Sequence, residues 1–188
     1  MRTAKHSLLE TVAASAAAPD PVRVAHVDAE SPRRQEAERF IRSVFHRHHD
    51  AFVRSFAPNL LLLEQEARVV AAVGWRGAAQ EPLFLERYLD EPVEILMERL
   101  TGQAFSRQQV VEVGHLASEK PGGSVQVIVS LARHLAREGY EWVVFTATRE
   151  LVRIFTKLGL PLLALAKADP ARLGAHAGDW GRYYEAQP

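Results

Sequence analysis

The sequence predicts an α+β domain in which helices cover both faces of one central, mostly antiparallel mixed sheet. Two observations predict this class. Short apolar runs typical of strands alternate along the chain with segments of helical periodicity. The order is also mixed, because a strand and a helix precede a group of antiparallel strands, and strand, helix, strand, helix and strand follow.

The composition is that of one ordinary globular domain. The 188 residues are 47% hydrophobic, and we expect a domain over residues 21–188 with a disordered or loosely helical tail over residues 1–20. The formal net charge is zero, so charge indicates neither nucleic acid nor an anionic membrane as a partner. The absence of cysteine excludes disulfides, thiolate metal sites and a cysteine nucleophile, and fits a reducing, cytoplasmic location. No apolar run approaches the ~20 residues of a membrane-spanning helix.

The first part of the chain predicts a strand, a helix and a hairpin. Val22–Val27 alternates apolar and polar residues, as a strand at or near a sheet edge does. Ser31-Pro32 opens a helix that is predicted to run to about Arg54. Leu60–Gln65 and Val69–Trp75 are separated by a short polar turn, and they predict an antiparallel hairpin covered on both faces.

Histidines cluster in the later turns of this first helix. His46 falls on one face with His49 or Asp50, at the spacing of metal ligands. The arginines around them would repel a cation, so we interpret the cluster as a solvated helix face and predict no metal site.

Two interpretations are open for Pro82–Asp90. Its apolar residues alternate, so we expect a strand or an extended arm that crosses the domain. Glu86, Tyr88 and Asp90 would then share one face, which is either a solvated edge or part of a substrate cleft. Pro92 follows in the first turn of a further helix.

Gln108–Gly139 is the stretch in which we expect any chemistry to lie. It begins with a β-branched apolar run, typical of a strand buried on both faces, that contains Glu112 and His115. Burying a polar group costs free energy, so a polar side chain on each face of such a strand indicates either a hydrogen-bond partner or a functional role. By strict alternation the residues on the two faces are Glu112, Gly114 and Leu116 on one, and Val111, Val113, His115 and Ala117 on the other.

A glycine turn, Glu119–Ser124, joins this strand to a helix. Ser124 is a good N-cap, and Gly139 ends the apolar stripe of the helix. Backbone N–H groups exposed by Gly122 and Gly123 beside a helix N-terminus would form an anion site of the kind that cradles phosphate. A tight turn without a ligand is the plainer alternative.

The C-terminal part predicts two more strands and a short helix. Glu141–Ala147 is typical of a buried strand, and Thr148 caps a helix that Gly159 ends. Leu160–Ala166 predicts a last strand, and Asp169-Pro170 starts one further turn. The aromatic tail, Trp180–Glu185, is expected to pack against the rest of the domain. One form of this packing would close over a cleft.

This order of elements resembles the GNAT N-acyltransferase fold, a three-layer α/β/α arrangement. Nearly the whole chain from about Pro21 is similar to one branch of it, the thermostable hemolysin family. The segments that carry this resemblance are NLLLLEQEARVVAAVGWRGA, EPLFLERYLDEPVE, VVEVGHLAS, FTATRELVRIFTKLGLPL and ADPARLGAHAGDWGRYYE. Glu112–Ser118 is also similar to the E-x-S-R-F-A-V stretch of acyl-homoserine-lactone synthases, which share the fold and use acyl-carrier donors.

The resemblance implies an acyl-donor site at the glycine turn. GNAT enzymes hold the donor pyrophosphate with a Q/R-x-x-G-x-G/A turn, in which Gly122 keeps the first glycine here. Glu119 stands in place of Gln or Arg and would repel a pyrophosphate, so either Lys120 compensates or an acyl carrier protein presents the donor. The donor is therefore expected to be acyl-CoA or acyl carrier protein, with no tightly bound cofactor. The residues implied to hold it are Leu116, Ala117, Ser118, Lys120, Gly122, Gly123, Ser124, Val125, Thr148 and Phe155.

A second departure from the superfamily pattern lies in the later helix. The tyrosine that often protonates the departing thiolate in N-x-x-A-x-x-L-Y-x-K-x-G-F is Phe155 here. Tyr88, Tyr183 and Tyr184 are the candidates to replace it, unless the site does not run ordinary acetyl transfer.

Acyl transfer to an amine needs a base and a polarised thioester carbonyl. Glu112 is the first candidate for the base, because desolvation in an apolar strand raises a carboxyl pKa, and His115 is the second. The alternatives are an ion pair with a helix arginine for Glu112 and a satisfied core position for His115. Backbone N–H groups at Leu116–Ser118 are the candidate oxyanion donors. The candidate substrate residues are Glu86, Tyr88, Trp75, Tyr183 and Tyr184, with a core position as the default for Trp75.

We therefore expect an acyltransferase that moves a medium or long acyl group from acyl-CoA or acyl carrier protein to a small amine. The family name introduces a membrane-active toxin as a competing class, and a catalytically inactive GNAT-fold binding protein is the third. A bacterial protein is expected, and a homodimer stays open.

Overall fold

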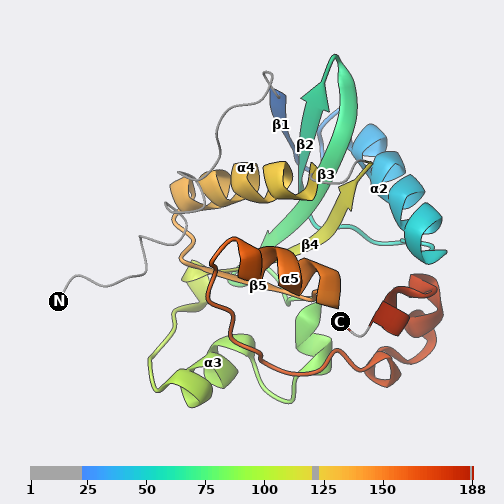
Figure 1. Cartoon of the computed structure of the whole chain (residues 1–188). Helices are drawn as coiled ribbons and strands as arrows, with labels where there is room; N and C mark the ends of the chain where they lie inside the picture. Colours follow the sequence, from blue (N-terminus) through green and yellow to red (C-terminus); the bar gives the residue numbers. More distant parts are fainter. Residues whose placement is uncertain (1–22, 120–122, 187) are drawn as a thin grey trace.

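The computed structural model describes residues 23–119, 123–186 and 188, with only the backbone of Gly123 and Ser124. Its centre is a five-stranded sheet in the order β1-β2-β3-β4-β5 (Figure 1). The first four strands pair antiparallel, and β5 is parallel to β4. The sheet is therefore mixed and mostly antiparallel, as predicted. The strands are β1 Arg23–Val27, β2 Asn59–Gln65, β3 Arg68–Gly77, β4 Val110–Ser118 and β5 Trp142–Phe145.

Helices pack on both faces of this sheet, and several single turns connect the elements. The α-helices are α2 Arg34–His49, α3 Val93–Thr101, α4 Gly123–Arg137 and α5 Arg149–Lys157. The 3-10 segments are η1 Leu85–Tyr88, η2 Arg107–Gln109, η3 Pro170–Trp180 and η4 Tyr183–Ala186. Figure 1 shows the C-terminal segment beneath the C-terminal end of α2, although the two are far apart in the sequence.

The leucine run of β2 supplies both faces of the sheet, because successive side chains of a strand point to opposite sides. Leu60 and Leu62 belong to the core beneath α2, here called the α2 core. Leu61 and Leu63 belong to the core beneath α4, the α4 core. All four are at most 1% exposed, so both helical layers are anchored on one strand.

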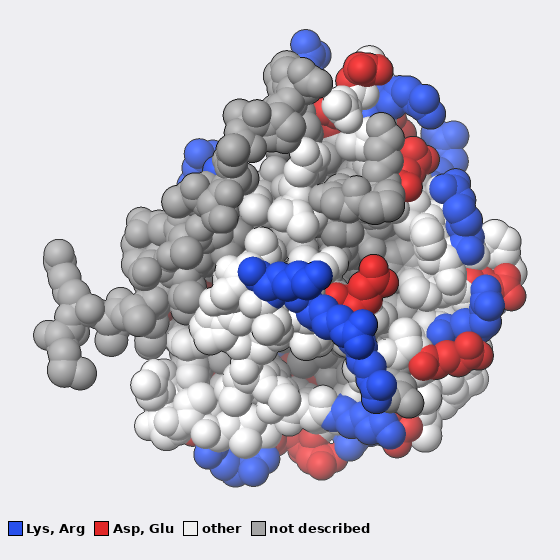
Figure 2. Space-filling view, in the orientation of Figure 1, with Lys and Arg blue, Asp and Glu red and all other residues white. Residues whose placement is uncertain are grey.

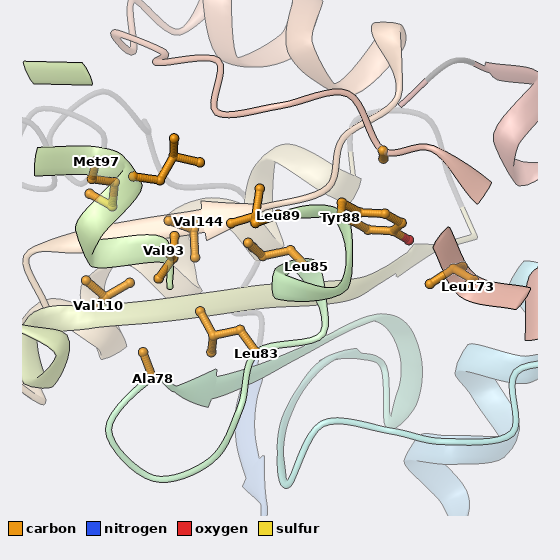
Figure 3. Packing of buried hydrophobic residues seen from close by; sticks show 12 residues of the cluster. Ala78, Leu83, Leu85, Tyr88, Leu89, Val93, Met97, Val110, Val144 and Leu173 are labelled. Atoms are coloured by element: carbon orange, nitrogen blue, oxygen red, sulfur yellow. The ribbon is translucent and has the colours of Figure 1, made fainter. Parts of the chain in front are cut away.

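A third cluster, the η1 core, joins η1 and α3 to the β4–β5 end of the sheet. Val110 and Val144 form its floor, and Leu173 of η3 closes one end beside Tyr88 (Figure 3). Val110 alternates along β4 with Val111, which belongs to the α4 core. The η1 core therefore lies on the same face of the sheet as α2.

The first helix is shorter than predicted. It ends at His49, because Asp50 takes a left-handed conformation (φ 53°). The N–H group of Asp50 donates to the carbonyl oxygen of His46, and that of Ala51 donates to the carbonyl oxygen of Phe45. Asp tolerates this conformation and can end a helix there. The chain then runs without regular structure to Asn59, so Arg54 lies outside the helix.

Pro82–Asp90 is neither a strand nor an extended arm, because its centre is the 3-10 turn η1. The N–H groups at the start of this turn bond to a carboxylate of β4 instead of to a neighbouring strand. As a result Glu86, Tyr88 and Asp90 do not share a face. Glu86 binds Arg107, Tyr88 is buried, and Asp90 is exposed.

The predicted last strand, Leu160–Ala166, is also wrong. Within the described residues no strand pairs with the outer edge of β5, and β5 itself is only four residues long. Pro161 has no N–H group to donate to a ladder. Leu162 and Leu163 are 42% and 50% exposed, so the apolar run that suggested a buried strand is largely at the surface.

Candidate active site

A bulge in β4 decides where His115 points. Pairing with β3 passes from Gly74–Gly114 to Ala72–Ala117, so β4 contains one extra residue between these pairs. His115 takes up the extra length with a left-handed backbone, φ 54°, which is uncommon for a residue other than glycine. The bulge breaks the alternation on which the prediction of two opposite faces rested.

Because of the bulge, His115 lies on the α2 face of the sheet. Its ring contacts Phe45, Phe56 and Trp180 at centroid distances of 6.3, 5.4 and 6.4 Å. Leu116, by contrast, packs on the α4 core. Glu112 and His115 therefore share one face, which corrects the predicted separation.

The imidazole of His115 is neutral at neutral pH. Burial, assisted by the charge of Arg76, lowers its pKa to about 4. Its Nδ1 atom is buried and has no hydrogen-bond partner among the described residues, although the residue as a whole, backbone included, is partly exposed. The backbone of Ser55 hydrogen-bonds to the ring and acts on the pKa in the opposite direction from burial. The neutral imidazole keeps one nitrogen that can accept a proton, although its lowered pKa makes it a weaker base than a free histidine.

Glu112 is 7% exposed, and both of its oxygens are occupied. Oε2 accepts a hydrogen bond from the N–H of Phe84 and Oε1 from that of Leu85, each at 2.7 Å. Arg76 of β3 lies 3.3 Å from Oε2. Burial raises the pKa of Glu112, while the two N–H groups and Arg76 act in the opposite direction. The carboxylate therefore fixes η1 to the sheet, and its ion-pair partner is a strand arginine and not a helix arginine.

An open space lies beside Gly114, between these two residues. A Cβ atom at Gly114 would meet no heavy atom within 4 Å. Its cross-strand partner Gly74 is crowded instead, since a Cβ there would lie 3.0 Å from Ala57 and 3.2 Å from Nδ1 of His115. Directly paired residues point to the same face, so this open space, called the hollow below, lies on the α2 face next to His115.

The C-terminal segment covers this region, and its docking agrees with the expectation for the aromatic tail. Trp180 packs against both the α2 core and the η1 core. Tyr183 stacks on Phe45 and donates a hydrogen bond of 3.2 Å to the carbonyl oxygen of Thr146. The hydroxyls of Tyr184 and Tyr88 bond to each other. Burial raises the pKa of all three tyrosines, so each is protonated at neutral pH.

β4 and β5 separate after a short paired stretch. Their pairing runs from Val110–Trp142 to Val113–Phe145, yet β4 continues to Ser118. Beyond Val113, no described strand lies against the β5 side of β4. Tyr183 meets the chain at Thr146, the first residue after β5, so its hydroxyl lies where the two strands part.

Several predicted site residues lie elsewhere. Trp75 is buried in the α4 core, 4.9 Å from the ring of His134, on the opposite face of the sheet from His115. Glu86 binds Arg107 at 2.6 Å and accepts from backbone N–H groups, so it holds the η1 turn together. Phe155 is buried against Phe145 at 4.7 Å.

The predicted donor residues are only partly described. Thr148 caps α5 by accepting from the N–H of Leu151, as expected. Val125 packs beside Leu160, and Ala117 is 1% exposed in the α2 core. Ser118 pairs with β3 opposite Ala71. Lys120 and Gly122 lie outside the described residues, and only the backbone of Gly123 and Ser124 is described.

Sequence reasoning missed Arg76, Phe45, Phe56 and Trp180. These residues reach the site through strand pairing and tertiary packing, which leave no local pattern. Arg76 is the partial exception, because a charged residue at the end of an apolar strand is a signal that could have been used.

Over the described chain, no group of three or more His, Asp or Glu residues is placed to hold a metal.

The mixed sheet, the bulged central strand, the separation of β4 from β5 and the helix that follows define a GNAT-like acyltransferase fold. The chain belongs to the thermostable hemolysin family, whose model matches residues 27–188. No curated protein gives a significant match. None of the described helices is both long and apolar enough to span a bilayer.

Two solved structures are similar to the chain at a TM-score of 0.50. One is the AHL synthase LasI, with 14% identity over 78% of this chain and 84% of that one. The other is FeeM, an N-acyl amino acid synthase from uncultured soil microbes, with 12% identity over 73% and 78%. At such low identity the similarity establishes the fold.

Proposed function

We propose that this protein is an acyltransferase that moves an acyl group from acyl-CoA or acyl carrier protein to a small amine. The observation that carries the proposal is the separation of β4 from β5 next to a hollow that contains a neutral histidine. The parted strands offer an unpaired backbone edge to a thioester arm, and the hollow offers a place for the amine. LasI is an AHL synthase and FeeM an N-acyl amino acid synthase, and both descriptions support the reaction class.

In this proposal the thioester lies between the parted strands. Backbone N–H groups of Leu116–Ser118 on the open edge of β4 polarise its carbonyl, as fixed dipoles aimed at the developing oxyanion. The amine occupies the space beside Gly114, within reach of His115. The rings of Phe45, Phe56 and Trp180 contact His115, Tyr183 stacks on Phe45, and a bound substrate would complete an apolar surround.

The reaction forms a C–N bond and breaks the C–S bond. His115 takes the proton that the amine loses, and the hydroxyl of Tyr183 gives a proton to the departing sulfur. Proton exchange with water then returns His115 to its neutral form and Tyr183 to its protonated form. Glu112 was the first candidate for the base, but its two occupied oxygens favour a positioning role, in which it holds η1 and Arg76 at the edge of the hollow.

The test measures free thiol released from acetyl-, octanoyl- and palmitoyl-CoA and from octanoyl-acyl carrier protein, with a panel of small amines as acceptors. Amine-dependent thiol release supports the proposal. His115→Gln is expected to lower kcat by at least 100-fold, the usual contribution of a general base. Absence of both thiol release and donor-induced thermal stabilisation with every donor would overturn the proposal in favour of a binding or membrane-active role.

A second variant tests the hollow. Gly114→Leu fills it, and we expect the fold to be retained because a Cβ there meets no atom within 4 Å and the backbone does not have a positive φ. A far-UV circular dichroism spectrum would check this. We expect the variant to lose amine-dependent turnover and to keep donor binding. Gly114→Ala is the matched control and is expected to keep most of the activity, because a methyl group leaves much of the space open. Equal activity of Gly114→Leu and the unaltered protein would exclude this hollow as the acceptor site.

A further inference from the structure

The outer face of α5 carries a basic stripe. Arg149, Arg153 and Lys157 recur at every fourth position and are all exposed. Residues spaced in this way lie above one another on one side of a helix. Figure 2 shows a continuous band of Lys and Arg over the position of α5 in Figure 1. Glu150 is the only acidic residue of the helix.

Two of these cations, Arg153 and Lys157, have no ion-pair partner among the described residues. Other surface arginines do form ion pairs, such as Arg99 with Glu91 and Arg172 with Asp90, each at 2.7 Å. The α5 stripe is thus a local positive field in a chain whose formal net charge is zero.

Exposed apolar side chains adjoin the stripe. Val152 is 38% exposed on α5 itself, and Leu162 and Leu163 follow it in the unpaired segment at 42% and 50%. Apolar contacts bordered by charges are typical of a protein-binding surface. Figure 2 shows a broad uncharged area beside the basic band.

We infer that the α5 stripe and these apolar residues form the docking surface for an acidic carrier protein that brings the acyl thioester. α5 begins at Arg149, directly after the segment in which Tyr183 binds Thr146 at the opening between β4 and β5. A carrier bound here would hold its thioester arm at that opening. The inference rests on the proposed function, since it names the partner that delivers the donor.

Charge favours this occupant over a second copy of the chain. A two-fold contact through α5 would place the cations of one copy against those of the other, and like charges directly opposed disfavour association. Three cations around a few partly exposed apolar side chains also make a weak attachment to a lipid surface. An acidic protein can form ion pairs with the α5 cations and also bury the exposed apolar side chains beside them.

The first experiment measures binding without chemistry. Purified apo- and octanoyl-loaded acyl carrier protein, labelled with a fluorophore, would be titrated with the full chain by anisotropy. Arg153→Glu with Lys157→Glu is expected to raise Kd by at least tenfold, and Leu162→Ser with Leu163→Ser by at least threefold. Arg39→Glu with Arg47→Glu on α2 is the matched control with the same charge change, and its Kd should stay within twofold.

The second experiment measures turnover with two donors. Octanoyl-pantetheine has the same thioester and arm but neither protein nor phosphate. The α5 double variant should lose at least tenfold in kcat/KM with octanoyl-acyl carrier protein and keep its value with octanoyl-pantetheine. If neither donor reacts, the proposed function fails while the anisotropy result still decides the docking surface.

Either of two results would overturn the inference. One is equal carrier binding by the α5 variant, the α2 control and the unaltered chain. The other is loss of binding to phosphatidylglycerol vesicles, but not to the carrier, in the α5 variant, which would assign this surface to a lipid membrane.

Discussion

At the scale of single residues, Glu112 shows how a buried charge is held. Each of its oxygens accepts one backbone N–H group of η1. In Glu112→Gln the amide supplies one acceptor oxygen in place of two, so one buried N–H loses its partner. We expect the free energy of unfolding to fall by roughly 1–3 kcal/mol, the usual cost of a stranded polar group. Urea unfolding would measure it, with the exposed Glu98→Gln as a control near zero.

His115 makes the stability of the protein depend on pH. Its pKa is 6.5 in the unfolded chain and about 4 in the folded one. Between these values the unfolded chain binds a proton that the folded protein does not, so the free energy of unfolding falls as the pH falls through this window. The total effect is on the order of 1–3 kcal/mol, because one pKa unit corresponds to about 1.4 kcal/mol and the residue is partly exposed to solvent.

The measurement is the urea midpoint between about pH 6.5 and about pH 4. His115→Gln should show a clearly smaller decrease over this range than the unaltered protein. His48→Gln, which changes an exposed histidine of α2, should keep the full decrease. Parallel profiles for all three proteins would show that His115 is not the group responsible.

At the scale of elements, the β2–β3 hairpin carries avoidable strain. The two residues of its turn, Glu66 and Ala67, both have positive φ, 51° and 60°. Asn-Gly is the preferred pair for such a turn, because both residues adopt this backbone at low cost. Glu66→Asn with Ala67→Gly is expected to stabilise the protein by roughly 1 kcal/mol. Thermal unfolding would measure it, and Ala104→Gly, at a position without positive φ, should not stabilise.

The elements that the sequence predicted correctly are those with local causes. The β2–β3 hairpin follows from two apolar runs and a short turn, and α5 follows from the Thr148 cap and the Gly159 stop. The elements that were predicted wrongly depend on contacts between residues far apart in the sequence. η1 exists because Glu112, 28 residues further along the chain, accepts the N–H of Phe84.

The candidate site was predictable only in part, for the same reason. Glu112 and His115 could be found because polar residues in an apolar strand are conspicuous. Their shared face could not be found, since the bulge depends on how β4 pairs with β3. Trp180 could not be found either, because it reaches the site by packing between the α2 core and the η1 core.

At the scale of the whole molecule, the C-terminal segment holds the two cores of one sheet face together. Trp180 contacts both, and backbone hydrogen bonds fix the chain on either side of it. Phe52 donates to the carbonyl oxygen of Asp179 at 2.6 Å, and Arg182 to that of His49 at 2.7 Å. The end of α2 and the C-terminal segment therefore behave as one structural unit over the candidate site.

Gly181 is the position on which this docking depends. Its φ of 49° and ψ of −126° suit glycine, and a Cβ atom there would lie 2.3 Å from the carbonyl oxygen of His49 and 2.4 Å from that of Asp50. Both atoms belong to the backbone and cannot move aside cheaply. Gly181→Ala should therefore detach the segment at a cost of roughly 2–3 kcal/mol, which includes backbone strain and lost packing of Trp180.

Trypsin cleavage after Arg182 reports this detachment directly, since the docked backbone bonds to α2 through this residue. Gly181→Ala should be cut several-fold faster than the unaltered protein, and its amine-dependent thiol release should fall because Tyr183 no longer stands at the opening between β4 and β5. Gly178→Ala is the control, because a Cβ there meets no atom within 4 Å and its backbone has no positive φ. Equal cleavage rates in the two variants would show that the segment is held by its side chains and not by the close backbone approach at Gly181.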